Sequence, residues 1–510
     1  MAAPLALEAV LTLVSENLLS IILAISVCFI LYVSCIAPYK KTRIKELVGG
    51  IPGPNHLPFI GTLIDTIKHG GDIRLQFAEY SRTYGRVYGL YLFGSPTIVI
   101  NDPDILKEVL VKEFHSFHDR PAFFPMPEPF DSMMFFAEGE TWHRVRTTVS
   151  PIFSAHKMKM VLPLMNNSCD IMMSKLQQAA EKGEPFNMYR MGQSLTMDFI
   201  LRIVFGIESS VQHNYDDPAF VAARSALEAS TFQKIAGAVV GMMPKPIKKM
   251  FSRVFFSHTK ELVEMTEKVI AAKKTQENST RKDILDLMLE AMIDDETKKK
   301  RMTEAEIIAQ CLIFMIAGYE GTNSALTFIC YSLATNPDIQ EKLQQEIDSV
   351  WTDADQVLSY DMVHQLSYLD MVVSETLRMY PPGFIQTRAV TQDCVIQGRR
   401  FRKGNAILMD VYSLHHDPEL WPEPERFNPE RFTAEAKQSR NPYSYLPFSA
   451  GPRNCVGMRF SLMELKLALT RILKKYSFVV TQDTKIPPTL KAGSALTCGG
   501  EMMLGVKARE

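Results

Sequence analysis

A single cysteine of the chain stands where the sequence could bind a metal ion. Cys455 ends a loop rich in glycine and proline, and an apolar-faced helix is predicted to begin at about Met458. Because a helix N-terminus favours negative charge and Arg453 adds positive charge, the pKa of the thiol should be lowered. Gly451 and Gly457 should let backbone amides approach the sulfur. Such a thiolate fits the fifth ligand of haem iron, although a nucleophile or a buried structural thiol would also fit the cysteine alone.

A long helix is predicted to begin at about Thr303, because Thr303 and Glu306 have the spacing of a capping box. Gly318 and Gly321 follow along this helix and should open the same face. Each glycine should cost roughly 1 kcal/mol relative to alanine. A groove that admits a small molecule would explain that cost, and a notch for packing against another helix is the alternative.

The remaining elements indicate one large helix-rich domain with minor β-sheets. Residues 87–92 and 97–100 are predicted as a β-hairpin, because a turn with glycine and proline separates them. Short apolar stretches between Phe384 and Met409 suggest further strands, and a one-sided apolar pattern predicts a helix after Pro337. No internal repeat and no second linker is evident.

Charge and cysteine usage exclude several classes of protein. The 510 residues include 56 Lys and Arg against 57 Asp and Glu, which gives no support to a nucleic-acid partner. The 8 cysteines include no C-x-x-C pair, so neither a zinc site nor covalently attached haem is supported. A disulfide framework is not expected in so large a chain.

The N-terminal end carries the pattern of a membrane anchor. Leu18 to Ala37 is an almost unbroken apolar run of the length that spans a bilayer, and basic residues follow it from Lys40. This asymmetry predicts a single transmembrane helix with the rest of the chain in the cytosol. The expected divisions are an N-terminal segment 1–37 with the anchor at about 18–37, a basic and proline-rich linker 38–58, and a catalytic domain 59–510.

The loop around Cys455 resembles the haem-binding segment of the cytochrome P-450 family. Residues 448–457, FSAGPRNCVG, fit the family pattern F-x-x-G-x-R-x-C-x-G at every defined position. Two other family segments are present in the expected order, E-x-x-R at residues 375–378 and P-E-R-F at residues 429–432. The resemblance implies the mainly α-helical P-450 fold, with haem b bound through Cys455. It also implies a buried ionic network of Glu375, Arg378 and Arg431.

The resemblance further assigns residues to the haem. Trp142 and Arg146 match the family's W-x-x-x-R helix, in which both side chains reach a haem propionate. Arginine suits this task because its planar fork binds carboxylates with two hydrogen bonds. The other cofactor-binding residues that the resemblance implies are Arg120, Arg388, Phe448 and Arg453.

The long helix departs from the family at one position. Ala317 to Glu320 match the distal A-G-x-[DE] pattern, but Gly321 occupies the place of an alcohol that helps to deliver protons to bound oxygen. Thr322 comes one step later, which rotates its side chain by about 100° around the helix. By resemblance, the catalytic roles fall to Glu320 and Thr322.

The chain resembles the animal microsomal branch that holds broad-specificity drug and steroid hydroxylases and thromboxane synthase. This implies a monooxygenase that inserts one oxygen atom from O2 into lipophilic xenobiotic, steroid or fatty-acid substrates. Electrons would come from NADPH through a separate reductase, with cytochrome b5 as a further partner, at the endoplasmic reticulum membrane. Two alternatives stay open: a thromboxane-synthase-like isomerase that rearranges a prostaglandin endoperoxide, and a haem-binding protein without turnover.

Overall fold

The computed structural model describes most of the chain after the expected anchor. It describes residues 48–54, 62–92, 95–121, 126–227, 256, 259–275, 283–290, 302–352 and 357–509. Within these ranges, no helix is both long and apolar enough to cross a bilayer. The anchor expected at about 18–37 lies outside the described residues, so it stays a prediction.

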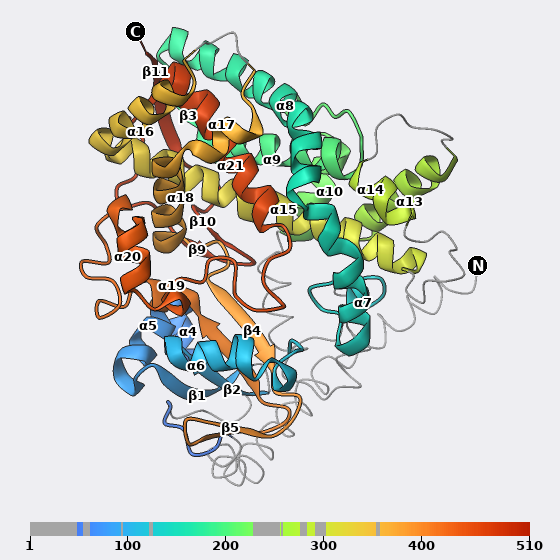
Figure 1. The fold of residues 1–510 in the computed structure, drawn as a ribbon, viewed down its shortest axis with the longest axis vertical. Coiled ribbons are helices and arrows are strands. Elements are labelled where there is room, and N and C mark those ends of the chain that lie inside the picture. Colours follow the sequence, from blue (N-terminus) through green and yellow to red (C-terminus); the bar gives the residue numbers. More distant parts are fainter. Residues whose placement is uncertain are drawn as a thin grey trace, which may run out of the picture.

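A four-stranded sheet forms one end of the molecule (Figure 1). Its order is β1 (Val87–Leu92), β2 (Ser95–Ile100), β7 (Ala406–Asp410) and β4 (Ile385–Ala389). The predicted hairpin is β1–β2, which pairs antiparallel, while β2 and β7 pair parallel. Tyr88 and Leu90 on one face of the sheet pack against Phe77 and Tyr80 of α5 (Ile73–Tyr84). Successive side chains of these strands point to opposite faces, and both faces are buried, one of them against α5.

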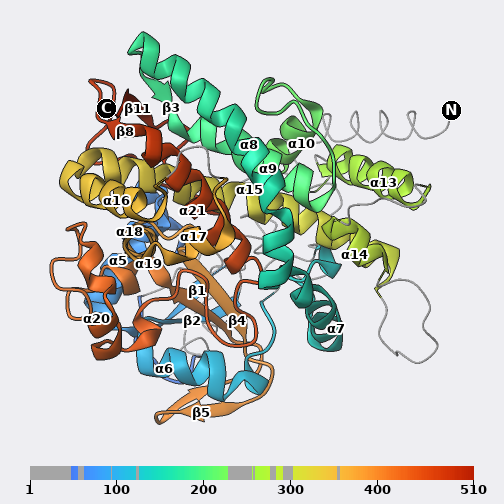
Figure 2. The ribbon, with the colours of Figure 1, turned by 45° about the horizontal axis from the view of Figure 1, so that its top comes forward.

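Long helices make up the other end of the molecule (Figures 1 and 2). Its main helices are α7 (Gly139–Val149), α8 (Ala155–Lys182), α9 (Met188–Val204), α15 (Glu304–Thr335), α16 (Pro337–Val350), α18 (Ser367–Met379) and α21 (Met458–Lys475). Shorter helices are α4 (Leu63–Lys68), α6 (Pro103–Lys107), α10 (Pro218–Leu227), α13 (Lys260–Thr275), α14 (Ile284–Glu290), α17 (Tyr360–Gln365), α19 (Val411–His415) and α20 (Ala434–Ser439). Small sheets pair β3 (Phe186–Asn187) with β11 (Met503–Ala508) and β8 (Tyr476–Val479), β5 (Cys394–Ile396) with β6 (Arg399–Phe401), and β9 (Lys491–Ala492) with β10 (Leu496–Thr497). The prediction of a helix-rich domain with minor sheets is confirmed.

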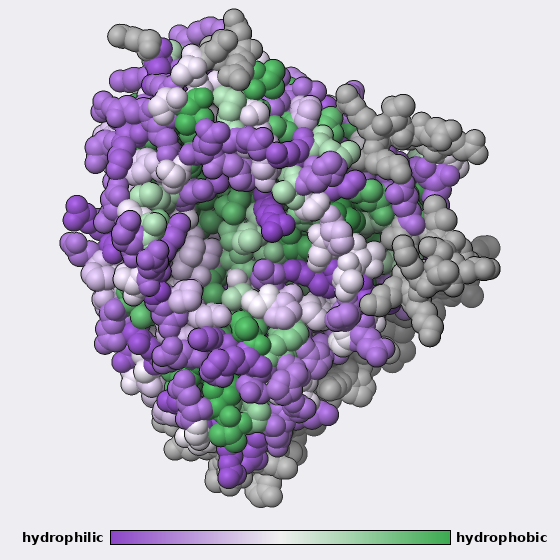
Figure 3. Space-filling model, viewed as in Figure 1, coloured by the Kyte–Doolittle hydropathy of each residue, from purple (hydrophilic) through white to green (hydrophobic). Residues whose placement is uncertain are grey.

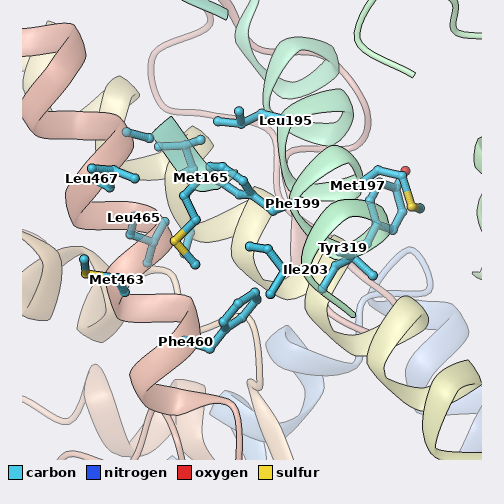
Figure 4. Packing of buried hydrophobic residues seen from close by; sticks show 14 of the residues in the cluster. Met165, Leu195, Met197, Phe199, Ile203, Tyr319, Phe460, Met463, Leu465 and Leu467 are labelled. Carbon is cyan, nitrogen blue, oxygen red and sulfur yellow. The ribbon is translucent and has the colours of Figure 1, made fainter. Parts of the chain in front are cut away.

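Helix α15 is the central element of this helical part. It begins at the predicted capping box, in which Thr303 and Glu306 each bond the other's backbone N–H. Its side chains are buried almost all round, as expected of a helix with neighbours on every side. It packs against α9, α18 and α21. Figure 4 shows side chains of α9 and α21 converging around Met165 of α8 in the same core.

Candidate functional site

Cys455 lies at the predicted place, just before the helix that the sequence indicates. Helix α21 begins at Met458, and Gly457 is its N-cap residue. The backbone N–H of Cys455 donates to the carbonyl of Phe448 at 2.9 Å, which closes the loop. Its side chain is exposed, whereas the protein around it is dense enough to desolvate it. The sulfur therefore borders a space enclosed by protein rather than bulk water.

The electrostatic environment of the thiol differs from the prediction. Burial is the largest influence and raises the pKa of Cys455 above its usual value. The N–H groups of Gly457 and Met458 and the charges of Arg146 and Arg120 oppose this, as the helix-start argument expected, but they do not outweigh it. The prediction that the loop itself lowers the pKa was wrong, because desolvation was left out. A bound cation would be needed to hold the sulfur as thiolate.

The glycines of the loop have different tasks from those predicted. Gly451 has φ +73°, and a Cβ there would overlap the carbonyl oxygen of Leu110. This glycine thus lets the loop turn against residue 110, not against the sulfur. A Cβ at Gly457 would meet nothing and would enter open space. No side chain therefore covers the backbone at Gly457, two residues after Cys455.

Three arginines predicted to bind the cofactor form a cluster of buried positive charge, in which only Arg453 has an ion-pair partner among the described residues, Asp119. The Nε atoms of Arg120, Arg388 and Arg453 are buried, and none has a hydrogen-bond partner among the described residues. Burial lowers the pKa of Arg388 to about 9 and that of Arg453 to about 10, and it holds the pKa of Arg120 well below its usual value. Repulsion between the arginines adds to the effect at Arg120 and Arg388. Such a cluster fits a dianionic group such as the two propionates of haem.

The remaining predicted cofactor residues surround this cluster. Trp142 is buried, and the Arg453 guanidinium lies 4.5 Å from its ring centroid. Arg146 donates to the carbonyl and the side chain of Asn454 at 2.9 and 2.7 Å, so in this structure it holds the Cys455 loop. Phe448 is half-buried at the start of the loop. Contact of Trp142, Arg146 and Phe448 with haem stays a prediction.

The ionic network that the resemblance implied is present. Arg378 donates to both carboxylate oxygens of Glu375 at 2.8 and 3.0 Å, and both side chains are fully buried. Nε of Arg431 lies 3.4 Å from Oε1 of Glu375. Arg378 also donates to the carbonyl of His415, whose ring accepts from the N–H of Leu446. The network therefore reaches the chain just ahead of Phe448, which supports the cysteine loop.

One stripe of α15 is accessible although the helix is central. Ala317 is exposed, and Ile313, Ile316, Glu320 and Gly321 are half-buried. These positions share a helical face because they recur every three or four residues. Thr322 lies within 3.0 Å of Ser461, near the start of α21. Thr322, one step along the helix from the stripe, therefore marks the crossing of α15 with α21, and Figure 3 shows apolar residues gathered in a hollow on this side of the molecule.

Only one of the two glycines of α15 borders open space, although both were predicted to do so. A Cβ at Gly318 would overlap Ile200 of α9, so this glycine is a helix-packing notch. A Cβ at Gly321 would meet nothing within 4 Å. A side chain at position 321, where the family usually has an alcohol, would therefore fit without moving its neighbours.

Sequence reasoning missed the partners of the predicted catalytic residues. Tyr189 of α9 donates to a carboxylate oxygen of Glu320 at 2.6 Å. The Thr322 hydroxyl also faces Glu464 of α21, a fully buried carboxyl group. Burial raises the pKa of Glu464 well above its usual range. Thr322 therefore points into the helix crossing rather than into the open space at Gly321.

Comparisons with known proteins agree with this geometry. A family model described as "Cytochrome P450" matches residues 51–502. The chain is 39% identical to "Cytochrome P450 3A2" of Rattus norvegicus over 470 residues, which cover 90% of this chain and 92% of that protein. It is 37% identical to "Cytochrome P450 3A29" of Sus scrofa over 455 residues, 88% of this chain and 89% of that protein. It is 40% identical to "Cytochrome P450 3A16" of Mus musculus over 449 residues, which cover 86% of this chain and 87% of that protein.

Proposed function

The chain belongs to the cytochrome P450 family and is a monooxygenase of that family, and from this premise we propose that it inserts one oxygen atom from O2 into lipophilic substrates. One observation supports the proposal above the others. An exposed cysteine at a helix start lies close to buried arginines, and two of these, Arg120 and Arg388, form no ion pair with a carboxylate among the described residues. A cofactor that carries both a metal ion and two carboxylates would bind the cysteine through the metal and the arginines through the carboxylates.

The residues that would hold haem b fall into two groups. Cys455 would bind the iron, and the loop held by Arg146 and Asn454 would keep the sulfur in place. Arg120, Arg388 and Arg453 would bind the propionates, beside Trp142. When bound, haem supplies the centre at which dioxygen is activated, while a thiolate ligand favours cleavage of the oxygen–oxygen bond.

The accessible stripe of α15 favours apolar substrates. Its residues Ile313, Ile316 and Ala317 form an apolar wall. Phe135 is an exposed aromatic residue whose ring lies 3.7 Å from the Arg120 guanidinium. Such a wall binds a substrate mainly by removing apolar surface from water. Xenobiotic, steroid or fatty-acid molecules are the classes that fit.

Proton handling would fall to Glu320. Gly321 offers no hydroxyl, and Thr322 is occupied with Ser461 in the helix crossing. Glu320 lies on the accessible stripe, and the hydrogen bond from Tyr189 fixes its carboxylate. A fixed carboxylate beside open space can pass protons through water, as a general acid–base group does.

Electrons would come from NADPH through a separate reductase, with cytochrome b5 as a second donor. We place the protein at the endoplasmic reticulum membrane, anchored by residues 18–37, with the catalytic domain 59–510 in the cytosol. This placement rests on the apolar run and on the basic residues after it.

A second candidate function is rearrangement of a prostaglandin endoperoxide, as in a thromboxane-synthase-like isomerase. The open space at Gly321 favours it, because an isomerase needs neither dioxygen nor a proton-delivering alcohol. A haem-binding protein without turnover is less favoured. Such a protein would not need an accessible stripe on its central helix.

Two assays distinguish the enzymes. Purified holoprotein is incubated with reductase, NADPH and a panel of lipophilic substrates, and separately with a prostaglandin endoperoxide without NADPH. We expect hydroxylated products only in the first assay. Product only in the second would overturn the monooxygenase proposal. In parallel, the spectrum of the reduced carbon monoxide complex should show a thiolate ligand in the wild type and lose that signature in Cys455→Ala.

A further inference from the structure

Asp119 lies where the elements that carry the haem-binding residues meet. Its backbone carbonyl accepts a hydrogen bond from Ala389 at 2.7 Å, in an isolated β-bridge directly beside Arg388. Its carboxylate oxygen Oδ1 accepts from the backbone N–H of Gly139 at 2.9 Å. Gly139 is the first residue of α7, the helix that carries Trp142 and Arg146. One residue thus links β4 to the start of α7.

The same carboxylate is the anionic partner of Arg453. Oδ1 of Asp119 lies 3.4 Å from Nη2 of Arg453, which also donates to the carbonyl of Ala137 at 2.6 Å. Among the described residues, no other carboxylate forms an ion pair with Arg120, Arg388 or Arg453. Oδ2 of Asp119 lies 3.2 Å from Nε2 of His118, which is 30% exposed. Asp119 is therefore the ion-pair partner of a buried cationic cluster, and it acts on Arg453 more strongly than the charge of nearby Glu138 does.

We propose that Asp119 is a positioning residue for the haem propionate site: it aims Arg453 and the start of α7, and its charge sets the reduction potential of the bound haem. The inference rests on the proposed function, because it concerns the cofactor of that same site. The physical reason is direct. Reduction removes one positive charge from the iron, so a nearby negative charge favours the oxidised form. A carboxylate at a helix N-terminus also stabilises the orientation of that helix.

The substitution Asp119→Asn separates the charge from the hydrogen bonds. Asparagine keeps an oxygen that can accept from Gly139, but it no longer offsets the charge of Arg453. In the full-length holoprotein, the ratio of reduced to oxidised haem at the wild-type midpoint potential should rise roughly fivefold, a shift of about 40 mV to more positive potential for a one-electron couple. Asp131→Asn is the matched control, since Asp131 is exposed, and its potential should equal that of the wild type.

Two further variants test the positioning role. Asp119→Ala removes the acceptor for Gly139 as well, so haem transfer to apomyoglobin should be several-fold faster than from wild type. Asp119→Glu restores the charge, and its potential should lie closer to wild type than that of Asp119→Asn. If Asp119→Asn folds poorly, the fraction of protein that incorporates haem is measured instead, and Asp119→Glu should lie closer to wild type than Asp119→Asn. If Asp119→Glu behaves like Asp119→Asn, or if Asp119→Asn keeps the wild-type potential, the inference is wrong.

Failure of this inference can be told from failure of the proposed function. If the wild-type protein lacked the thiolate signature of its reduced carbon monoxide complex, the proposed function itself would fail. If the signature is present and Asp119→Asn changes neither potential nor haem loss, only the role of Asp119 is refuted. Both readouts are made without substrate and without turnover.

Discussion

Single side chains in this site carry charges that the fold leaves unneutralised. A buried guanidinium without a carboxylate partner is costly, because desolvation is offset neither by an ion pair nor by a full set of hydrogen bonds. Arg388 is the clearest case: it is fully buried, and among the described residues it donates only to the carbonyl of Thr387 and, at 3.3 Å, to Ser449. The protein keeps such a residue at a cost in stability that only a bound anion can offset.

Replacing Arg388 by methionine should therefore have opposite effects with and without cofactor. The free energy of unfolding of the haem-free protein should rise by about 1–3 kcal/mol, because an unpaired buried charge is removed. The holoprotein should lose haem faster, because one propionate loses its partner. Chemical denaturation of the apoprotein and haem transfer from the holoprotein measure the two effects. The exposed Arg400→Met is the control, and a destabilised apoprotein would contradict the argument.

We expect the residue at 321 to set how well the enzyme couples electron use to product formation. Gly321→Thr adds the missing hydroxyl to a position where the structure has room. Product formed per NADPH consumed should rise roughly twofold or more, because a positioned proton donor is worth at least that. Gly321→Val, with the same shape and no hydroxyl, is the control. Equal coupling in both variants would show that shape, not proton transfer, is what position 321 supplies.

Glu464 makes stability depend on pH. Burial raises the pKa of its carboxyl well above 4.5, so the folded protein keeps a proton that the unfolded chain releases once the pH exceeds about that value. The contribution of Glu464 to the free energy of unfolding therefore falls as pH rises. Glu464→Gln, which cannot ionise, should be more stable than wild type at pH about 7 and lose that advantage below pH about 4. Denaturation across pH, with the exposed Glu341→Gln as control, measures this; a constant difference would contradict it.

At the scale of elements, the contact of α9 with α15 depends on a glycine in each helix. A Cβ at Gly192 would overlap the side chain of buried Asn323, and Thr196 bonds the carbonyl of Tyr319 in the same contact. Gly192→Ala should lower the free energy of unfolding by about 1–2 kcal/mol, because overpacking outweighs the gain in helix propensity. Gly321→Ala faces open space and should instead gain up to about 1 kcal/mol. Denaturant unfolding of both holoproteins tests this, and equal shifts would refute it.

Local signals predicted where several elements begin. The capping box at Thr303 and Glu306 begins α15, and Pro337 begins α16. The glycine at 457 precedes the helix expected at Met458. The hairpin was also predicted, although β2 begins at Ser95 rather than Thr97. These features depend on neighbouring residues alone, which is why the sequence reveals them.

Partners that are distant in the sequence were beyond such reasoning. Tyr189 and Glu320 meet because α9 packs along α15, and Asp119 meets Gly139 and Ala389 only in the folded chain. The resemblance to the P-450 family predicted which arginines belong to the site. It could not predict which of their atoms would lack a hydrogen-bond partner. The sign of the Cys455 pKa shift was missed for the same reason, since desolvation depends on the whole surroundings.

At the scale of the whole molecule, the N-terminal segment is expected to set only location. Removing residues 1–37 should release the protein from microsomal membranes into the soluble fraction, because the apolar run at 18–37 is the predicted anchor. The thiolate signature of the reduced carbon monoxide complex should persist, since every candidate site residue lies beyond residue 100. Alkaline carbonate extraction and the spectrum measure the two properties. A truncated protein that stays in the membrane pellet would point to a second membrane-binding surface.

The parallel pairing of β2 with β7 has a consequence for how the chain is made. Ile98 and Val99 leave the ribosome long before Ile407 and Leu408, the residues beside which they must lie. At synthesis rates of roughly 5–20 residues per second, the interval is on the order of tens of seconds. During that time the nascent hairpin exposes an unpaired edge that other chains could join. Because β11, at residues 503–508, must still pair with β3, translation is nearly finished before the last sheet can close.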